Sequence, residues 1–160
     1  MKHPVRTATM TERRGATITI REIIESADGL QNSPLSDAKK RRALSELDAH
    51  IYEDIVLRHE GAEAYMIPAA GGGYTHRVFP YESDTAQLIA PARFRKMYVY
   101  YLCLEADLAN DEPERYSNDL LLFQQLYAAF GAYYNETHMP LHHAVICTAP
   151  AYQRGGAYAG

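Results

Sequence analysis

The sequence predicts a mainly α-helical protein: a helical bundle with a long antiparallel helix hairpin, an irregular or β-hairpin loop insertion, and extended termini. Several segments repeat apolar residues at steps of three and four, which is the period of a helix packed on one face. Proline, glycine and capping residues stand where these segments end. The 160 residues suit one domain, over 17–140, between an N-terminal arm (1–16) and a C-terminal tail (141–160).

Two helices are expected in the first part of this domain. The first begins at Thr19, whose hydroxyl can cap it, and stops near Gly29. The second covers residues 38–61 and ends at Gly61. Its apolar face consists of Leu44, Leu47, Ile51 and Ile55. Its first turns carry Lys39, Lys40, Arg41 and Arg42. The helix dipole disfavours cations there, so we expect them either in solvent or against an anionic partner.

Residues 62–90 lack a helical period, and a β-hairpin or a projecting loop is expected there. The triple glycine Gly71, Gly72 and Gly73 lies between the aromatic-containing stretches "AYMIP" and "YTHRVFPY". A phosphate-binding loop would continue with Lys-Ser or Lys-Thr, whereas Tyr74 follows here. This segment therefore predicts an insertion into the bundle without a nucleotide site.

Two further helices are expected to fold back on each other as a hairpin. One begins near Pro91 and carries a stripe of Phe94, Met97, Tyr98, Tyr101, Glu105 and Leu108. The other opens at Pro113 after acidic residues that suit a helix start, and stops before Pro140.

The hairpin carries more apolar surface than one small domain can bury. The expected helix-packing or oligomer interface is Tyr98, Tyr101, Tyr116, Leu120, Phe123, Tyr127, Phe130 and Tyr134. The last helix has a second apolar surface of Leu121, Leu122, Leu126, Ala129 and Tyr133. A helix that is apolar nearly all round is either central or shared with another subunit, so we expect a homo-oligomer.

Charge and hydropathy exclude several classes of function. The net charge of −4 disfavours a protein that grips nucleic acid by bulk electrostatics. The stretch from Glu105 to Glu114 contains several carboxylates and no lysine or arginine, so it would also repel phosphate. No apolar run approaches the roughly 20 residues that cross a bilayer, so no membrane association is expected.

No set of residues predicts catalysis, a metal or a cofactor. Pro140 separates His138 from His142 and His143, which breaks helical ligand spacing. Cys103 lies among apolar residues and is expected to be an inert thiol. Glu105 and Asp107 point to different helix faces and are expected in solvent or paired with a neighbouring chain.

The tail "LHHAVICTAPAYQRGGAYAG" contains a short apolar segment followed by glycine, alanine and tyrosine. It can add a strand to a neighbouring chain or lie in a groove; the alternative is that it has no ordered structure. The residues expected to bind a partner are Val145, Ile146, Tyr152, Arg154 and Tyr158.

Three stretches resemble a known family. They are "TITIREIIESADGL", "LSELDAHIYEDIVLRHEG" and "MYVYYLCLEADLANDEPERYSNDLLLFQQLYAAFGAYYNETHMP", which together cover about half the chain. The chain is similar in these stretches to the head-tail connector (adaptor or neck) proteins of tailed bacteriophages. The resemblance implies a helical subunit of a ring, typically of twelve copies, between the portal protein and the stopper or tail-completion protein. It also implies a place at the head-tail junction of the virion, and in the host cytoplasm during assembly.

In such a ring, DNA passes through the channel without specific binding, because repeated acidic subunits resist phosphate adsorption. The loop residues Gly71, Gly72, Gly73 and Tyr74 are then expected to line the channel or dock on an adjoining ring. Two alternatives stay open: a neck or tail-completion protein at another level of the same particle, and a small regulatory or binding module outside the virion.

Overall fold

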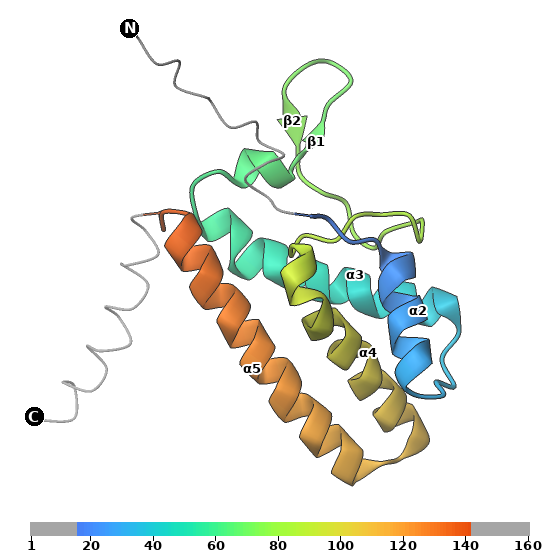
Figure 1. The fold of residues 1–160 in the computed structure, drawn as a ribbon. Coiled ribbons are helices and arrows are strands. Elements are labelled where there is room, and N and C mark those ends of the chain that lie inside the picture. The colour runs from blue at the N-terminus through green and yellow to red at the C-terminus, as the bar shows by residue number, and fades with distance from the viewer. Residues whose placement is uncertain (1–15, 142–160) are drawn as a thin grey trace, which may run out of the picture.

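The computed structural model describes residues 16–141, and it confirms the prediction of a mainly α-helical fold (Figure 1). The helices are α2 (Ile20–Leu30), α3 (Asp37–Asp54), α4 (Arg95–Asn110) and α5 (Pro113–Thr137). Between α3 and α4 lie two short 3₁₀ turns, η1 (Val56–Arg58) and η2 (Ala62–Tyr65), and the strands β1 (Ile67–Pro68) and β2 (Tyr74–Thr75). A third 3₁₀ turn, η3 (Ala92–Phe94), leads into α4.

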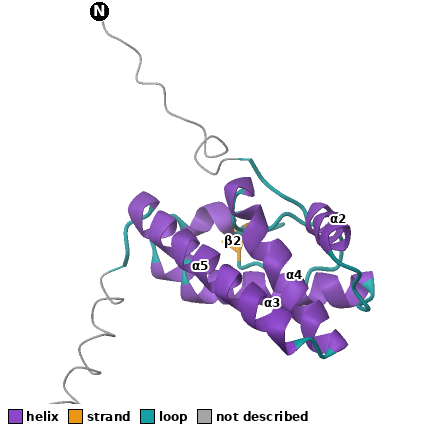
Figure 2. Ribbon diagram, turned by 60° about the horizontal axis from the view of Figure 1, so that its bottom comes forward, coloured by secondary structure: helices purple, strands orange, loops and turns teal. Residues whose placement is uncertain are grey.

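Helix α4 is the centre of the bundle. It packs against α5 on one side and against α2 and α3 on the other, and both ribbon views place it between α5 and α2 (Figures 1 and 2). Ile23, Leu44, Ile51, Met97 and Tyr98 are fully buried between α2, α3 and α4. The core therefore lies on one side of the α4–α5 hairpin, and α5 covers only its edge.

Helix α2 starts where the sequence predicts. The Thr19 hydroxyl accepts a hydrogen bond from the Glu22 backbone N–H at 3.4 Å, and the Glu22 carboxylate accepts one from the Thr19 N–H at 2.7 Å. This reciprocal pair is a capping box. The helix continues one residue beyond Gly29 to Leu30, so glycine does not terminate it.

Helix α3 ends at Asp54, well before Gly61 where the sequence predicts its end. The chain tightens into η1, which keeps Val56 fully buried. The His59 ring lies with Nδ1 2.7 Å from the Ile55 carbonyl oxygen and so partners one carbonyl at the helix end. Gly61, with φ of +82°, directly precedes η2 instead. Tertiary burial, rather than the glycine, decides where α3 stops.

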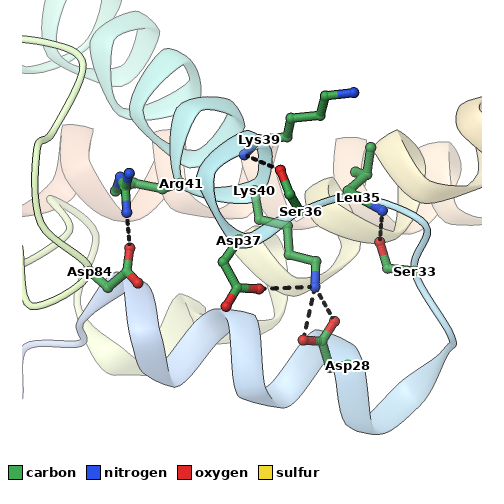
Figure 3. Close-up of polar contacts among 9 residues, drawn as sticks. All are labelled: Asp28, Ser33, Leu35, Ser36, Asp37, Lys39, Lys40, Arg41 and Asp84. Carbon is green, nitrogen blue, oxygen red and sulfur yellow. Dashed lines mark hydrogen bonds and ion pairs between the residues drawn. The ribbon is translucent and has the colours of Figure 1, made fainter.

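The basic cluster at the start of α3 divides into two pairs of residues. Lys39 and Arg42 are exposed to solvent, as one alternative predicts, whereas Lys40 and Arg41 are paired within the chain, unlike both alternatives (Figure 3). Lys40 is buried, with Nζ 2.6 Å from the Asp28 carboxylate at the end of α2. Arg41 Nη1 lies 2.7 Å from the Asp84 carboxylate. These cations therefore fasten α3 to α2 and to the loop before α4.

Helices α4 and α5 form the expected hairpin through a tight turn. Asp111 ends α4 in the left-handed conformation, with φ of 56°, and Pro113 occupies the first position of α5. The helices have 16 and 25 residues, so they span about 24 Å and about 38 Å at the standard rise. Consequently the last turns of α5 extend past the start of α4.

Candidate interaction surface

The predicted seam residues of α5 lie on its inner half. Phe123 contacts Tyr101 of α4, with ring centroids 5.3 Å apart, and Tyr127 follows at 5.7 Å from Phe123. Further along, Phe130 packs edge to face on Phe94 at 5.1 Å. Tyr116 and Leu120 are half-buried near the turn, while Phe130 and Tyr134 are buried. These contacts hold α5 on the bundle by one row of aromatic side chains.

Tyr98 differs from the other seam residues because it points away from α5. Its hydroxyl donates a hydrogen bond to the carboxylate of Asp48 on α3 and accepts one from the Ala90 N–H at 3.0 Å. Tyr98 therefore joins α4 to α3 and to the loop before α4. The spacing of apolar residues in the sequence cannot tell whether Tyr98 faces α3 or packs between α4 and α5.

Within residues 16–141, nothing covers the outer face of α5. Only Phe130 and Tyr134 of its 25 residues are buried. Leu121 is 56% exposed and Leu122 is 38% exposed, and Ala128, Ala129 and Ala132 are exposed further along. No charged residue occurs from Leu120 to Asn135. We call the exposed residues Leu121, Leu122, Ala128, Ala129 and Ala132 the outer face of α5.

The buried carboxylate of Asp48 organises most of the segment between β2 and α4. Tyr81 donates its hydroxyl hydrogen to Asp48 at 2.6 Å, and the Ile89 N–H donates at 3.0 Å. Burial raises the pKa of Asp48 to about 6, although the hydrogen bonds from Tyr81 and Tyr98 and the charge of Arg77 act in the opposite direction.

Arg77 extends this network into the irregular segment. Its Nη1 donates to the Tyr81 hydroxyl at 2.7 Å and to the Gln87 carbonyl at 2.9 Å, and its Nε donates to the Tyr65 carbonyl at 2.8 Å. Sequence reasoning missed Asp48 and Arg77. The signal for Asp48 is its position, since it follows Leu44 by four and precedes Ile51 by three on the core face of α3.

The glycine loop forms the tip of an exposed β-hairpin that projects from the bundle (Figure 1). Ile67 pairs with Thr75 and Pro68 with Tyr74. Gly72 and Gly73 have φ of 92° and 79°, a conformation that glycine adopts without strain. Open space surrounds the places that a Cβ would take at Gly71, Gly72 and Gly73, as far as residues 16–141 show, and Tyr74 is exposed. The hairpin is thus accessible to a partner.

Two residues weighed as chemical candidates lie on different elements, Cys103 in α4 and His138 directly after α5. Cys103 is buried, and burial raises the pKa of its thiol to about 11. His138 stacks on Tyr134 with ring centroids 3.9 Å apart. Within residues 16–141, no group of three His, Cys, Asp or Glu side chains is placed to hold a metal ion.

Asp107 corrects one expectation, because it lies neither in solvent nor against a neighbouring chain. Its side chain is fully buried under the α4–α5 turn, with Arg115 Nε 3.7 Å from its carboxylate. Burial and the charge of Asp107 together raise the pKa of nearby Asp119. Glu105, by contrast, is half-exposed.

The remaining predicted residues fall outside the described part of the chain. These are Val145, Ile146, Tyr152, Arg154 and Tyr158, together with His142 and His143. Among residues 16–141, no helix combines the length and apolar character that a bilayer crossing requires. Comparison of the chain with models of protein families, with curated proteins and with solved structures finds no match.

Proposed function

We propose that this protein is a head-tail connector, or adaptor, of a tailed bacteriophage. Its copies form a ring between the portal protein and the stopper or tail-completion protein and extend the channel through which DNA passes. The proposal rests on the resemblance in the helical stretches and on one structural observation, the uncovered outer face of α5.

The outer face of α5 supports self-association because water is a poor environment for it. Leu121 and Leu122 stand side by side in an uncharged stretch, and each leucine side chain gains roughly 1.5–3 kcal/mol when fully buried. The alanines beyond them allow close approach of a second surface. A second copy of the chain is the occupant that the proposed ring supplies.

The exposed hairpin and the acidity of the chain fit the same role. The residues from Ala64 to Thr75 carry no charge, and Ile67 and Tyr74 are exposed there, which suits docking on an adjoining protein ring. The net charge of −4, repeated around a ring, would let DNA pass without adsorbing to the wall.

Co-sedimentation with the portal protein of the same phage tests the proposal. We expect the full chain to sediment with the portal and to appear as a ring in electron micrographs, alone or on the portal. Binding to a tail protein but not to the portal would place it at another level of the neck. A stable monomer that binds neither, and is absent from purified particles, would favour a regulatory module.

The double substitution Leu121→Gln/Leu122→Gln should abolish assembly and leave the subunit folded. Both side chains are exposed in the isolated chain, so helix content by circular dichroism should not change. Mass in solution, measured by light scattering, should fall to that of a monomer. Val78→Gln is the matched control, because Val78 is 72% exposed in the segment between β2 and α4 and lies outside the outer face of α5. Equal loss of assembly in both variants would contradict a role for the outer face of α5.

A further inference from the structure

The two ends of the α4–α5 hairpin carry opposite charge. Arg93, Arg95 and Lys96 are exposed at the start of α4; we call them the basic start. Asp111, Glu112 and Glu114 lie at the turn between the helices; we call them the acidic turn. Arg115 is the only lysine or arginine between Ala106 and Glu136. One end of the hairpin is therefore a cationic surface and the other an anionic one.

This arrangement opposes the dipole of α4. A helix N-terminus is electropositive and favours carboxylates, while its C-terminus favours cations. Helix α4 has no acidic residue in its first turn and no basic residue in its last, and it ends instead among carboxylates. Glu112 and Glu114 suit the N-terminus of α5, but neither end of α4 gains from this distribution, and the basic start has no such compensation.

Contacts within the described residues compensate little of the charge at the basic start. Lys96 has no carboxylate within ion-pair distance there, and Arg95 reaches only the exposed Glu22, at 3.5 Å. The Arg93 guanidinium lies 4.8 Å from the ring centre of Tyr133, which offers no countercharge. The basic cluster of α3 differs, since Lys40 and Arg41 are paired inside the chain.

The acidic turn is likewise short of cations. Arg115 is shared between Glu112, at 2.9 Å, and the buried Asp107, at 3.7 Å. Asp111 and Glu114 are exposed, and neither is within ion-pair distance of a cation among residues 16–141. The two patches of one chain cannot neutralise each other, because about 24 Å of helix separates them.

We infer that the basic start of α4 in one copy docks on the acidic turn of the next copy, head to tail. The inference rests on the self-association proposed above and specifies its geometry. A single contact of this kind supplies the missing countercharge of both patches. Because the two surfaces differ, the contact is heterologous, and its repetition closes a ring or continues as a filament.

Charge variants that leave the outer face of α5 intact test this geometry. Arg95→Gln/Lys96→Glu removes the net positive charge of the basic start and places a carboxylate there beside Arg93. Asp111→Asn/Glu114→Lys removes the net negative charge of the acidic turn and places an ammonium group there beside Glu112. Asparagine is chosen at Asp111 because it tolerates the left-handed conformation there. Each variant is checked for unchanged helix content, and masses are measured by sedimentation velocity at low ionic strength, where exposed charges are least screened.

We expect each variant alone to lose the assembled species that the wild type forms, because one of the two patches then has no net charge with which to attract the other. An equimolar mixture of the two should restore it, since every contact between unlike copies is complementary again. The matched control, Lys39→Glu/Arg58→Gln, changes the charge as the first variant does, at exposed positions in and after α3, and should assemble like the wild type.

Three results would overturn the inference. If the wild type assembles and the mixture does not, the patches do not meet. If the mixture restores only a dimer, the contact is two-fold and not head to tail. If the first variant assembles normally but loses binding to duplex DNA, the basic start binds a polyanion and not the next copy. A wild type that stays monomeric, alone and with the portal protein, would instead remove the proposed function together with the inference.

Discussion

Asp48 occupies a position that the apolar period of α3 assigns to the core, and it is fully buried. A buried carboxylate is costly unless hydrogen bonds and countercharge compensate for lost water. Tyr81, Tyr98 and the Ile89 N–H provide the hydrogen bonds, and Arg77 lies beyond Tyr81. One residue thus fixes the chain between β2 and α4, where regular secondary structure is scarce.

The stability of the fold should depend on the charge of Asp48. Its pKa is about 6 in the folded state, above the ordinary value of 3.8. Between pH 3.8 and about pH 6, the folded state therefore binds more protons than the unfolded state. The contribution of Asp48 to the free energy of unfolding therefore falls as pH rises through this window, by about 3 kcal/mol in all. Asp48→Asn lacks this decline. Urea unfolding of both proteins from about pH 4 to pH 7 measures it.

The pH dependence of stability should also change in the Tyr81→Phe variant. This substitution removes a hydrogen bond that favours the charged form of Asp48, so the pKa of Asp48 should rise further and the decline should move to higher pH. If wild type and Asp48→Asn differ in stability by the same amount at every pH, the titration of Asp48 is not linked to folding.

Among the helices, local signals determine where α2 and α5 begin. The Thr19–Glu22 capping box and Pro113 are both short-range features, and the sequence predicts both starts. The end of α3 could not be predicted in this way. Its position depends on burying Val56 and on the contact between His59 and the Ile55 carbonyl, which only the tertiary fold provides.

Loss of the cap of α2 should weaken the whole bundle, because this helix packs on α4. Thr19→Ala removes the hydroxyl that accepts from the Glu22 N–H and should cost about 1 kcal/mol of the free energy of unfolding. Thr19→Ser keeps the hydroxyl and should recover most of the loss. Thermal unfolding measures both; equal melting temperatures for the wild type and Thr19→Ala would show that the cap contributes nothing.

The candidate interaction surface could be predicted from the sequence only in part. The helical period identifies the aromatic row of α5, but it cannot tell that Tyr98 turns toward Asp48. The same limit applies to the basic cluster of α3. Lys40 and Arg41 pair with Asp28 and Asp84, which are distant in sequence, and no local pattern predicts such contacts.

At the scale of the whole molecule, the long segment between α3 and α4 divides into two parts. The part near α4 is tied to the bundle, since the Ile89 N–H donates to Asp48 and the Ala90 N–H donates to Tyr98. At the hairpin tip, by contrast, Gly72 and Gly73 have open space beside them in the described part of the chain. The segment contains little regular secondary structure, yet one part of it is hydrogen-bonded to the bundle and the other part is exposed.

Hydrogen exchange should show this division. We expect the Ile89 and Ala90 amides to exchange only through global unfolding, at rates comparable to those of the core of α3. The Gly73 amide should exchange much faster, because its surroundings are exposed. Amide-resolved exchange in heavy water provides the measurement, and fast exchange at Ile89 would mean that the Asp48 network opens independently of the bundle.

The charge order along α4 has a consequence for engineering. An acidic residue at position 96 would suit the electropositive end of the helix and should raise the melting temperature of the solitary subunit slightly. On the geometry inferred above, the same change would spoil assembly. Directed evolution for heat resistance of the isolated subunit would then enrich substitutions that impair its assembly. This is a trade-off between stability and function, located in one helix turn.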